Sequence, residues 1–144
     1  MMGALALAGL LVVVPFAPPG NKDAHLTFAD RQMAMKLAAA KVQVVVSEPI
    51  DAATSAPSLC QKYGGDGILV GTLRHDQHQA PMYHWPSHTE IRLERLRCDG
   101  KVTWKGVAIG DVDRQFGNPP AHVDASIDLA LDNAVQQLLA NLAL

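Results

Sequence analysis

The spacing of apolar residues changes along the chain, and each change predicts a different element of secondary structure. Residues 10–16 are continuously apolar, contain three successive valines and include Pro15 near their end. Because valine is β-branched and stiff, this segment is expected to form a first buried strand. Residues 28–41 then carry Ala29, Met33 and Leu37 at helical spacing, which predicts a helix. Thr27 and Asp30 form a candidate capping pair at its start.

The next segments repeat the strand-helix-strand pattern. Residues 42–46 are rich in valine and predict a short strand. A short helix follows, with Pro57 in its first turn and Gly64-Gly65 at its end, because proline suits the start of a helix and glycine its end. Residues 68–73 are almost continuously apolar, which predicts a strand in the interior of a sheet.

The second half of the chain predicts a hairpin and a long helix. Residues 74–88 follow no periodic pattern and include two prolines, so we expect a long loop there. Residues 89–98 and 101–109 are strand-like and joined by Asp99-Gly100, a strong signal for a hairpin turn. The alternation slips once in each arm, which predicts a bulge. After residues 118–120, an apolar stripe predicts the last helix; its members are Val123, Ile127, Ala130, Leu131, Ala134, Leu138 and Leu142.

These elements predict an α/β protein of the two-layer α+β kind. The expected order is β-α-β-α-β-β-β-α, with a mixed β-sheet and about three helices packed on it. Residues 10–144 are expected to form a single α/β domain. Residues 1–9 are a candidate remnant of a signal segment, and residues 1–16 as a whole fit either a signal or a first strand. They are too few to span a membrane, and no Lys or Arg precedes them.

Composition narrows the functional classes. The chain has 12 Lys and Arg against 14 Asp and Glu, a net charge of −2. There is no basic excess, so nucleic acid is not an expected partner. No stretch predicts a stable transmembrane segment.

Three short motifs resemble those of a group of bacterial envelope proteins. They are VVVPF at 12–16, YGGDGILVG at 63–71 and DGKVTW at 99–104. Together with the element order, they resemble the N-terminal domain of the Tol-system propeller protein, the curli-secretion lipoprotein and the lipoprotein activators of penicillin-binding proteins. The chain departs from that pattern at Gly65, where alanine is usual, and in lacking a lipid-acceptor cysteine. The resemblance implies a non-enzymatic periplasmic domain, or one peripheral to the outer membrane, that binds an envelope protein.

Four histidines in the expected loop are candidate metal ligands. Neutral imidazoles bind Zn²⁺ or Cu²⁺, and a loop could bring His75, His78, His84 and His88 together. However, their spacing places no tight pair on a rigid element. We therefore expect a solvated loop and no cofactor, and keep a small periplasmic metal-binding protein as the alternative.

The two cysteines, Cys60 and Cys98, allow three interpretations. They could form a disulfide, since the two are expected to lie near neighbouring strands, or remain buried thiols, because cysteine packs as a small hydrophobe. Cys60 could also be the nucleophile of a cysteine-dependent hydrolase, although the chain has no nucleophile signature. We therefore expect a protein that is not an enzyme.

The same loop holds Met82, Tyr83 and Trp85 in a chain with only 5% aromatic residues. Tyrosine and tryptophan are frequent binding hot spots because they bury a large area at low entropic cost. These three residues are the candidate partner-binding site. In the alternative, Trp85 folds back and covers the edge of the sheet.

Overall fold

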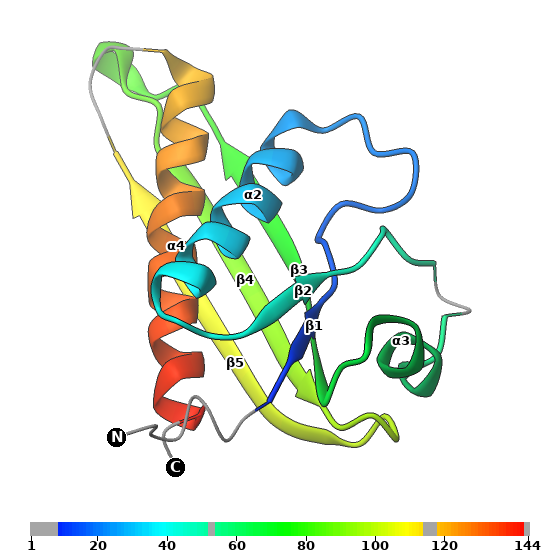
Figure 1. Ribbon diagram of the computed structural model, residues 1–144. Helices are drawn as coiled ribbons and strands as arrows, with labels where there is room; N and C mark the ends of the chain where they lie inside the picture. The colour runs from blue at the N-terminus through cyan, green and yellow to red at the C-terminus, as the bar shows by residue number, and fades with distance from the viewer. Residues whose placement is uncertain (1–8, 52–53, 114–117, 143–144) are drawn as a thin grey trace.

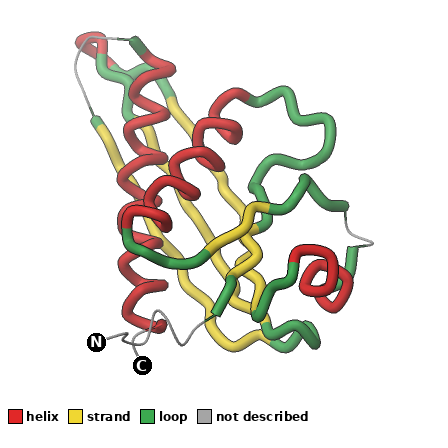
Figure 2. Tube along the Cα trace, viewed as in Figure 1, coloured by secondary structure: helices red, strands yellow, loops and turns green. Residues whose placement is uncertain are grey.

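A computed structural model describes residues 9–51, 54–113 and 118–142 of the chain. It shows an α/β fold with three α-helices and one five-stranded mixed sheet, and it confirms the predicted order of elements (Figures 1 and 2). The elements are β1 (Leu11–Val13), α2 (Ala24–Ala39), β2 (Val44–Val46), α3 (Ala56–Tyr63), β3 (Gly67–Gln77), the 3₁₀ turn η1 (Pro81–Tyr83), β4 (Ser87–Leu96), β5 (Val102–Val112) and α4 (Pro119–Leu142).

The sheet has parallel and antiparallel halves, in the order β2-β1-β3-β4-β5. β1 pairs in parallel with β2 and with β3, as expected for strands joined through helices. β3, β4 and β5 are antiparallel neighbours. β3 is therefore an interior strand, as its apolar sequence predicted, and β2 and β5 are the two edges.

Helices α2 and α4 pack on one face of the sheet and enclose the main core (Figure 1). Side chains from both helices and from the sheet are fully buried there, among them Leu37 of α2, Leu69 of β3 and Leu131 of α4. Helix α3 lies away from these helices and packs against the opposite face, where Leu59 and Cys60 contact Val12 and Ile68. Because successive strand residues point to opposite faces, Ile68 and Leu69 belong to different cores.

The start of α2 differs from the prediction. The helix begins at Ala24, and its N-cap is Asp23, whose Oδ1 accepts a 2.9 Å hydrogen bond from the backbone N–H of His25. The capping pair predicted at Thr27 and Asp30 is therefore wrong, because an aspartate one turn earlier already satisfies the helix start. Asp30 instead accepts hydrogen bonds from the backbone N–H groups of Phe16 and Ala17, which hold the segment after β1. Burial raises the pKa of the Asp30 carboxyl.

The signals for the end of α3 and for the hairpin turn are confirmed, whereas only one of the two alternation slips corresponds to a bulge in the described pairing. Helix α3 starts after Ser55 and ends at Gly64, which has a φ of 69° and so adopts a left-handed conformation that suits glycine. The hairpin of β4 and β5 turns at Asp99-Gly100. Its register shifts once, because Arg95 pairs with Trp104 while Leu96 pairs with Val102. That shift places one extra residue in β5, as a bulge does.

The long loop predicted at residues 74–88 is wrong. β3 continues to Gln77 and β4 already begins at Ser87, with His75 opposite Thr89 and Gln77 opposite Ser87. The side chains that face the helices here are polar, so the usual apolar alternation was absent from the sequence. Gln77 instead donates a hydrogen bond from Nε2 to the carbonyl of Pro119, which connects the β3–β4 hairpin to the first residue of α4.

Residues 1–8, which make up most of the candidate signal remnant, lie outside the described residues. Within the described part of the chain, no helix is both long enough and apolar enough to cross a membrane.

Candidate functional site

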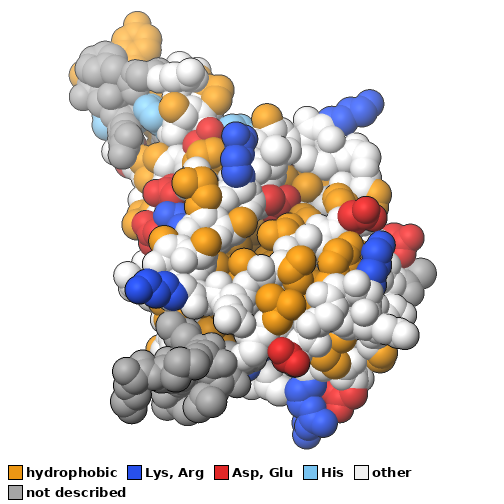
Figure 3. Space-filling model, viewed as in Figure 1, with side chains coloured by type: hydrophobic (Ala, Val, Ile, Leu, Met, Phe, Trp, Pro, Cys, Tyr) orange, Lys and Arg blue, Asp and Glu red, His pale blue; other side chains and the backbone are white. Residues whose placement is uncertain are grey.

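The connection between β3 and β4 forms a tip that displays two large apolar side chains. The backbone closes it through hydrogen bonds from the N–H of Ala80 to the carbonyl of His84 and from the N–H of His78 to that of Pro86. Met82 and Tyr83 lie in the turn η1 and are 71% and 68% exposed. A hydrophobic side chain forms the outermost point of this end of the molecule (Figure 3). We call residues 78–86 the hairpin tip.

The backbone at the apex is strained. Met82 has a φ of 66° and Tyr83 a φ of 58°, a left-handed conformation that ordinary side chains rarely adopt. Such residues cost of order 1–3 kcal/mol each and are concentrated at functional sites. Both of these side chains are strongly exposed, whereas Trp85 is half-buried. The three candidate partner-binding residues are thus neighbours, but only two of them are strongly exposed.

The structure does not bring the four loop histidines together. His75 faces the helices, and its Nε2 lies 3.2 Å from Oδ2 of Asp23. His88 lies on the opposite face of the sheet, with Nδ1 2.5 Å from Oδ1 of Asp111. Nδ1 of His84 lies 3.0 Å from Oδ1 of Asp113, and the side chain of His78 belongs to the tip. His75, His84 and His88 therefore each have a different carboxylate partner.

A metal ion needs several ligands at one point. Among the residues that the structure describes, no group of three or more His, Cys, Asp or Glu side chains could hold one. Histidine side chains are visible at the hairpin end of the molecule, but as separate groups (Figure 3). The alternative of a metal-binding loop therefore has no geometric support in this structure.

Sequence reasoning missed a polar cluster that joins three elements. Nδ1 of His25, on α2, lies 2.7 Å from Oδ1 of Asp124, on α4, and the rings of His25 and His75 meet edge to face with centroids 5.0 Å apart. Asp23 accepts from both His75 and the backbone of His25. Burial acts to raise the pKa of Asp23, but these hydrogen bonds outweigh it and the pKa lies below its usual value. The sequence did contain one signal for this cluster, namely Asp23, an aspartate directly before the helix α2.

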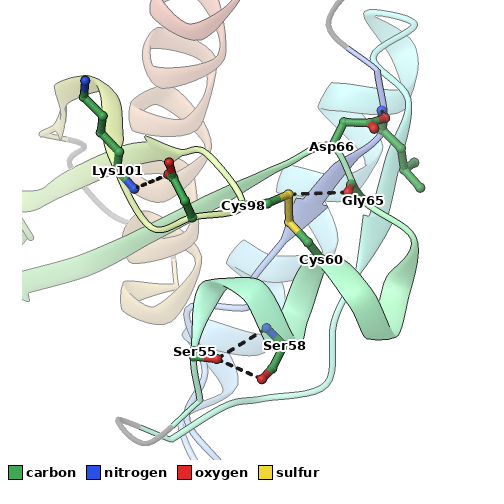
Figure 4. Close-up of a disulfide and its surroundings, with 9 residues drawn as sticks. Ser55, Ser58, Cys60, Gly65, Asp66, Cys98 and Lys101 are labelled. Carbon is green, nitrogen blue, oxygen red and sulfur yellow. Dashed lines mark hydrogen bonds between the residues drawn. A yellow bond between two sulfur atoms is a disulfide. The ribbon is translucent and has the colours of Figure 1, made fainter.

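A disulfide joins Cys60 of α3 to Cys98, beside the turn of the β4–β5 hairpin (Figure 4). Its Sγ atoms are 2.01 Å apart and the Cα atoms 5.8 Å apart, across a sequence separation of 38. The bond fixes the smaller helix to the sheet, on the face opposite α2 and α4. In this state Cys60 has no thiolate, so the hydrolase hypothesis has no nucleophile there.

A small hollow lies beside the half-buried carboxyl group of Asp30. Phe16, Met33 and Leu69 line it together with apolar residues of β1 and β3. Its water-accessible volume is about 10 Å³, roughly the room that a single water molecule needs. It therefore does not accommodate an organic substrate.

Comparison with known proteins identifies the fold but no family. No family model matches the sequence, and no curated protein matches it. Among solved structures, lipoprotein GNA1162 of Neisseria meningitidis matches with a TM-score of 0.59 and 18% identity over 92% of this chain and 98% of that one. A minor lipoprotein of Acinetobacter baumannii matches with a TM-score of 0.58 and 16% identity, over 94% and 95%. PelC of Paraburkholderia phytofirmans, solved as a dodecamer, matches with a TM-score of 0.58 and 15% identity, over 92% and 86%.

These matches correct the family suggested by the sequence motifs. The fold is shared with the lipoprotein GNA1162 and with PelC, at 18% and 15% identity. The specific resemblance to the Tol-system propeller protein, the curli-secretion lipoprotein and the penicillin-binding-protein activators is wrong. The physical reason is that the motifs encode a strand end, a glycine helix cap and a hairpin turn. Any chain with this order of elements needs such features, so they identify the fold and not a family.

Proposed function

We propose that the protein is a non-catalytic accessory or assembly protein of the bacterial envelope that binds another envelope protein through the hairpin tip. The observation that carries this proposal is the strained, strongly exposed pair Met82 and Tyr83 at the apex. Large side chains held outward by an unfavourable backbone are typical of a recognition surface. Trp85, which is half-buried and follows two residues later, adds aromatic area near the proposed contact.

Two further observations support the periplasm as the compartment. The fold is shared with envelope lipoproteins. A disulfide such as the one between α3 and the β4–β5 hairpin is stable in an oxidising compartment and rare in a reducing one.

The test is site-specific photocrosslinking in living cells of the source bacterium. A photoreactive amino acid replaces Tyr83 in one variant and Met35, which is 59% exposed on α2, in the matched control. We expect the Tyr83 variant to form one discrete adduct with another envelope protein, and Met82→Ala in the same chain to reduce its yield. The Met35 variant should form no such adduct.

The outcomes distinguish the alternatives. Equal adducts from both positions would indicate nonspecific contact and contradict the proposal. If the only adduct is with a second copy of this chain, the tip mediates self-association, and the proposal of a different envelope protein as partner is wrong. Trp85→Ala tests whether Trp85 contacts the partner or covers the sheet. An unchanged melting temperature with a lost adduct would indicate direct contact with the partner. A lower melting temperature with a retained adduct would indicate that Trp85 covers the sheet.

A further inference from the structure

Strand β5 has eleven residues and lies at an edge of the sheet, where β4 is its only partner among the strands of the described residues. In an edge strand, alternate residues turn their peptide groups away from the sheet, where they form a template for another strand. The carbonyl groups of Val107 and Ile109 are of this kind, because side chains from α4 reach them beside the sheet. The odd-numbered residues of β5 therefore present their backbone groups at the edge.

Two amides of α4 cover this edge. Asn133 donates from Nδ2 to the carbonyl of Ile109 at 2.9 Å, and Gln137 donates from Nε2 to the carbonyl of Val107 at 2.9 Å. Four helix residues rise about 6 Å, and two strand residues rise about 6.7 Å, so the two spacings match. We call Asn133 and Gln137 the capping amides.

A glycine lets the helix approach closely enough for this contact. A Cβ atom at Gly110 would collide with the backbone carbonyl oxygen of Ser126 and the backbone nitrogen of Ala130. α4 therefore packs closely against β5 (Figure 1).

The exposed side chains of β5 are complementary to themselves. The residues on the outer face include, in order, Lys105, Val107, Ile109 and Asp111. In an antiparallel pair of β5 strands centred on Ala108, Lys105 lies opposite Asp111 of the second copy and Val107 lies opposite Ile109. Cross-strand pairs of opposite charge and of β-branched residues stabilise sheets. Val107 is 47% and Ile109 40% exposed, and the Lys105 and Asp111 side chains are each 70% exposed. Within the chain, Lys105 lies 3.9 Å from Glu94 and Asp111 contacts His88, so both exposed charges would exchange these contacts for the partner strand.

Other registers lose this complementarity. Centring the pair on Val107 places Lys105 opposite apolar Ile109. Centring it on Ile109 places Val107 opposite the carboxylate of Asp111. Both keep the edge-facing backbone groups in line, so side-chain chemistry is what selects the register.

We propose that the β5 edge is a surface for pairing with a second copy of this chain, in the antiparallel register centred on Ala108, and that the capping amides hold it closed in the monomer. Pairing requires Asn133 and Gln137 to release the carbonyl groups of β5, which then accept from the partner strand. This surface is separate from the hairpin tip, so the inference does not depend on the proposed function.

The test compares sedimentation velocity of the wild type with that of Asn133→Ala/Gln137→Ala. We expect a monomeric wild type and a dimeric variant, with association at least about tenfold stronger because each competing hydrogen bond is worth about 1 kcal/mol. A variant that remains monomeric would overturn the proposal, and a wild type that dimerises as strongly as the variant would overturn the role of the amides.

The register is tested by charge exchange and by crosslinking in the variant that lacks the capping amides. Lys105→Asp should abolish the dimer, and Lys105→Asp/Asp111→Lys should restore it, which aggregation of an unfolded chain would not do. A chain with Val107→Cys mixed with one carrying Ile109→Cys should form a disulfide-linked dimer on oxidation, whereas each alone should not. Equal crosslinking of Val107→Cys with itself would show a different register and overturn the assignment.

Discussion

Nδ1 of His25 lies 2.7 Å from Oδ1 of Asp124, a contact between residues 99 positions apart. It joins the first turn of α2 to the first half of α4, and His75 of β3 packs edge to face on the same imidazole. Lys36, further along α2, makes a second connection through Nζ to Asp128 and Asp132 of α4. The two helices that cover the main core are therefore also tied along their polar sides.

The first prediction concerns this tie. Asp124→Ala removes the partner of a partly buried histidine, and we expect the free energy of unfolding to fall by about 1 kcal/mol. Chemical denaturation measures the change. Asp51→Ala, on an exposed connection outside these helices, is the control and should have a smaller effect. If Asp124→Ala is as stable as the wild type, the contact is not a stabilising one.

The second prediction tests which face of β3 is dry. Leu69 is 1% exposed and points toward α2 and α4, whereas Val70 is half-buried on the other face. Leu69→Asp should cost several kcal/mol because it buries an unpaired carboxylate, and Val70→Asp should cost less. Thermal melting of the two variants provides the comparison. Equal losses of melting temperature would contradict the alternation of faces.

The hydrophobic pattern was sufficient to predict the order of the elements, because the burial of apolar side chains determines that pattern. The continuous apolar run at β3 and the stripe on α4 are direct consequences of packing two layers of helix and sheet. Gly64 and Asp99-Gly100 marked their turns because only a few residue types suit those backbone conformations.

The hairpin tip and the polar contacts could not be predicted in this way. The extended end of β3 carries His75 and Gln77 where apolar residues are usual, and their partners Asp23 and Pro119 are distant in sequence. The capping of β5 by Asn133 and Gln137 likewise depends on how α4 lies on the sheet. Such contacts follow from tertiary geometry, which a single sequence does not express as a periodic signal.

The third prediction concerns the disulfide. Thiol titration of denatured, unreduced protein, produced by export to the periplasm of the expression host, should detect no free thiol. Reduction should lower the free energy of unfolding by roughly 3–4 kcal/mol, because the bond closes a long loop in the unfolded chain. Cys60→Ala/Cys98→Ala should match the reduced wild type and no longer respond to reductant. Two titratable thiols in the unreduced protein would refute the pairing.

The last prediction concerns pH and His88. The hydrogen bond that His88 donates to the Asp111 carboxylate raises the pKa of His88 above its usual value of 6.5, with weaker attraction from Asp76 and Glu90, while slight burial acts in the opposite direction. Since the folded pKa exceeds the unfolded one, the stabilisation is complete below about pH 6.5 and is lost as the pH rises through the folded pKa.

An NMR titration of the His88 ring should therefore give a pKa above 6.5, and Asp111→Asn should bring it back toward that value. The effect on stability should be small, because the His88 side chain is 42% exposed and solvent screens the pair. High salt should reduce the pKa shift for the same reason. A His88 pKa at or below 6.5 in the wild type would show that the contact with Asp111 does not form in solution.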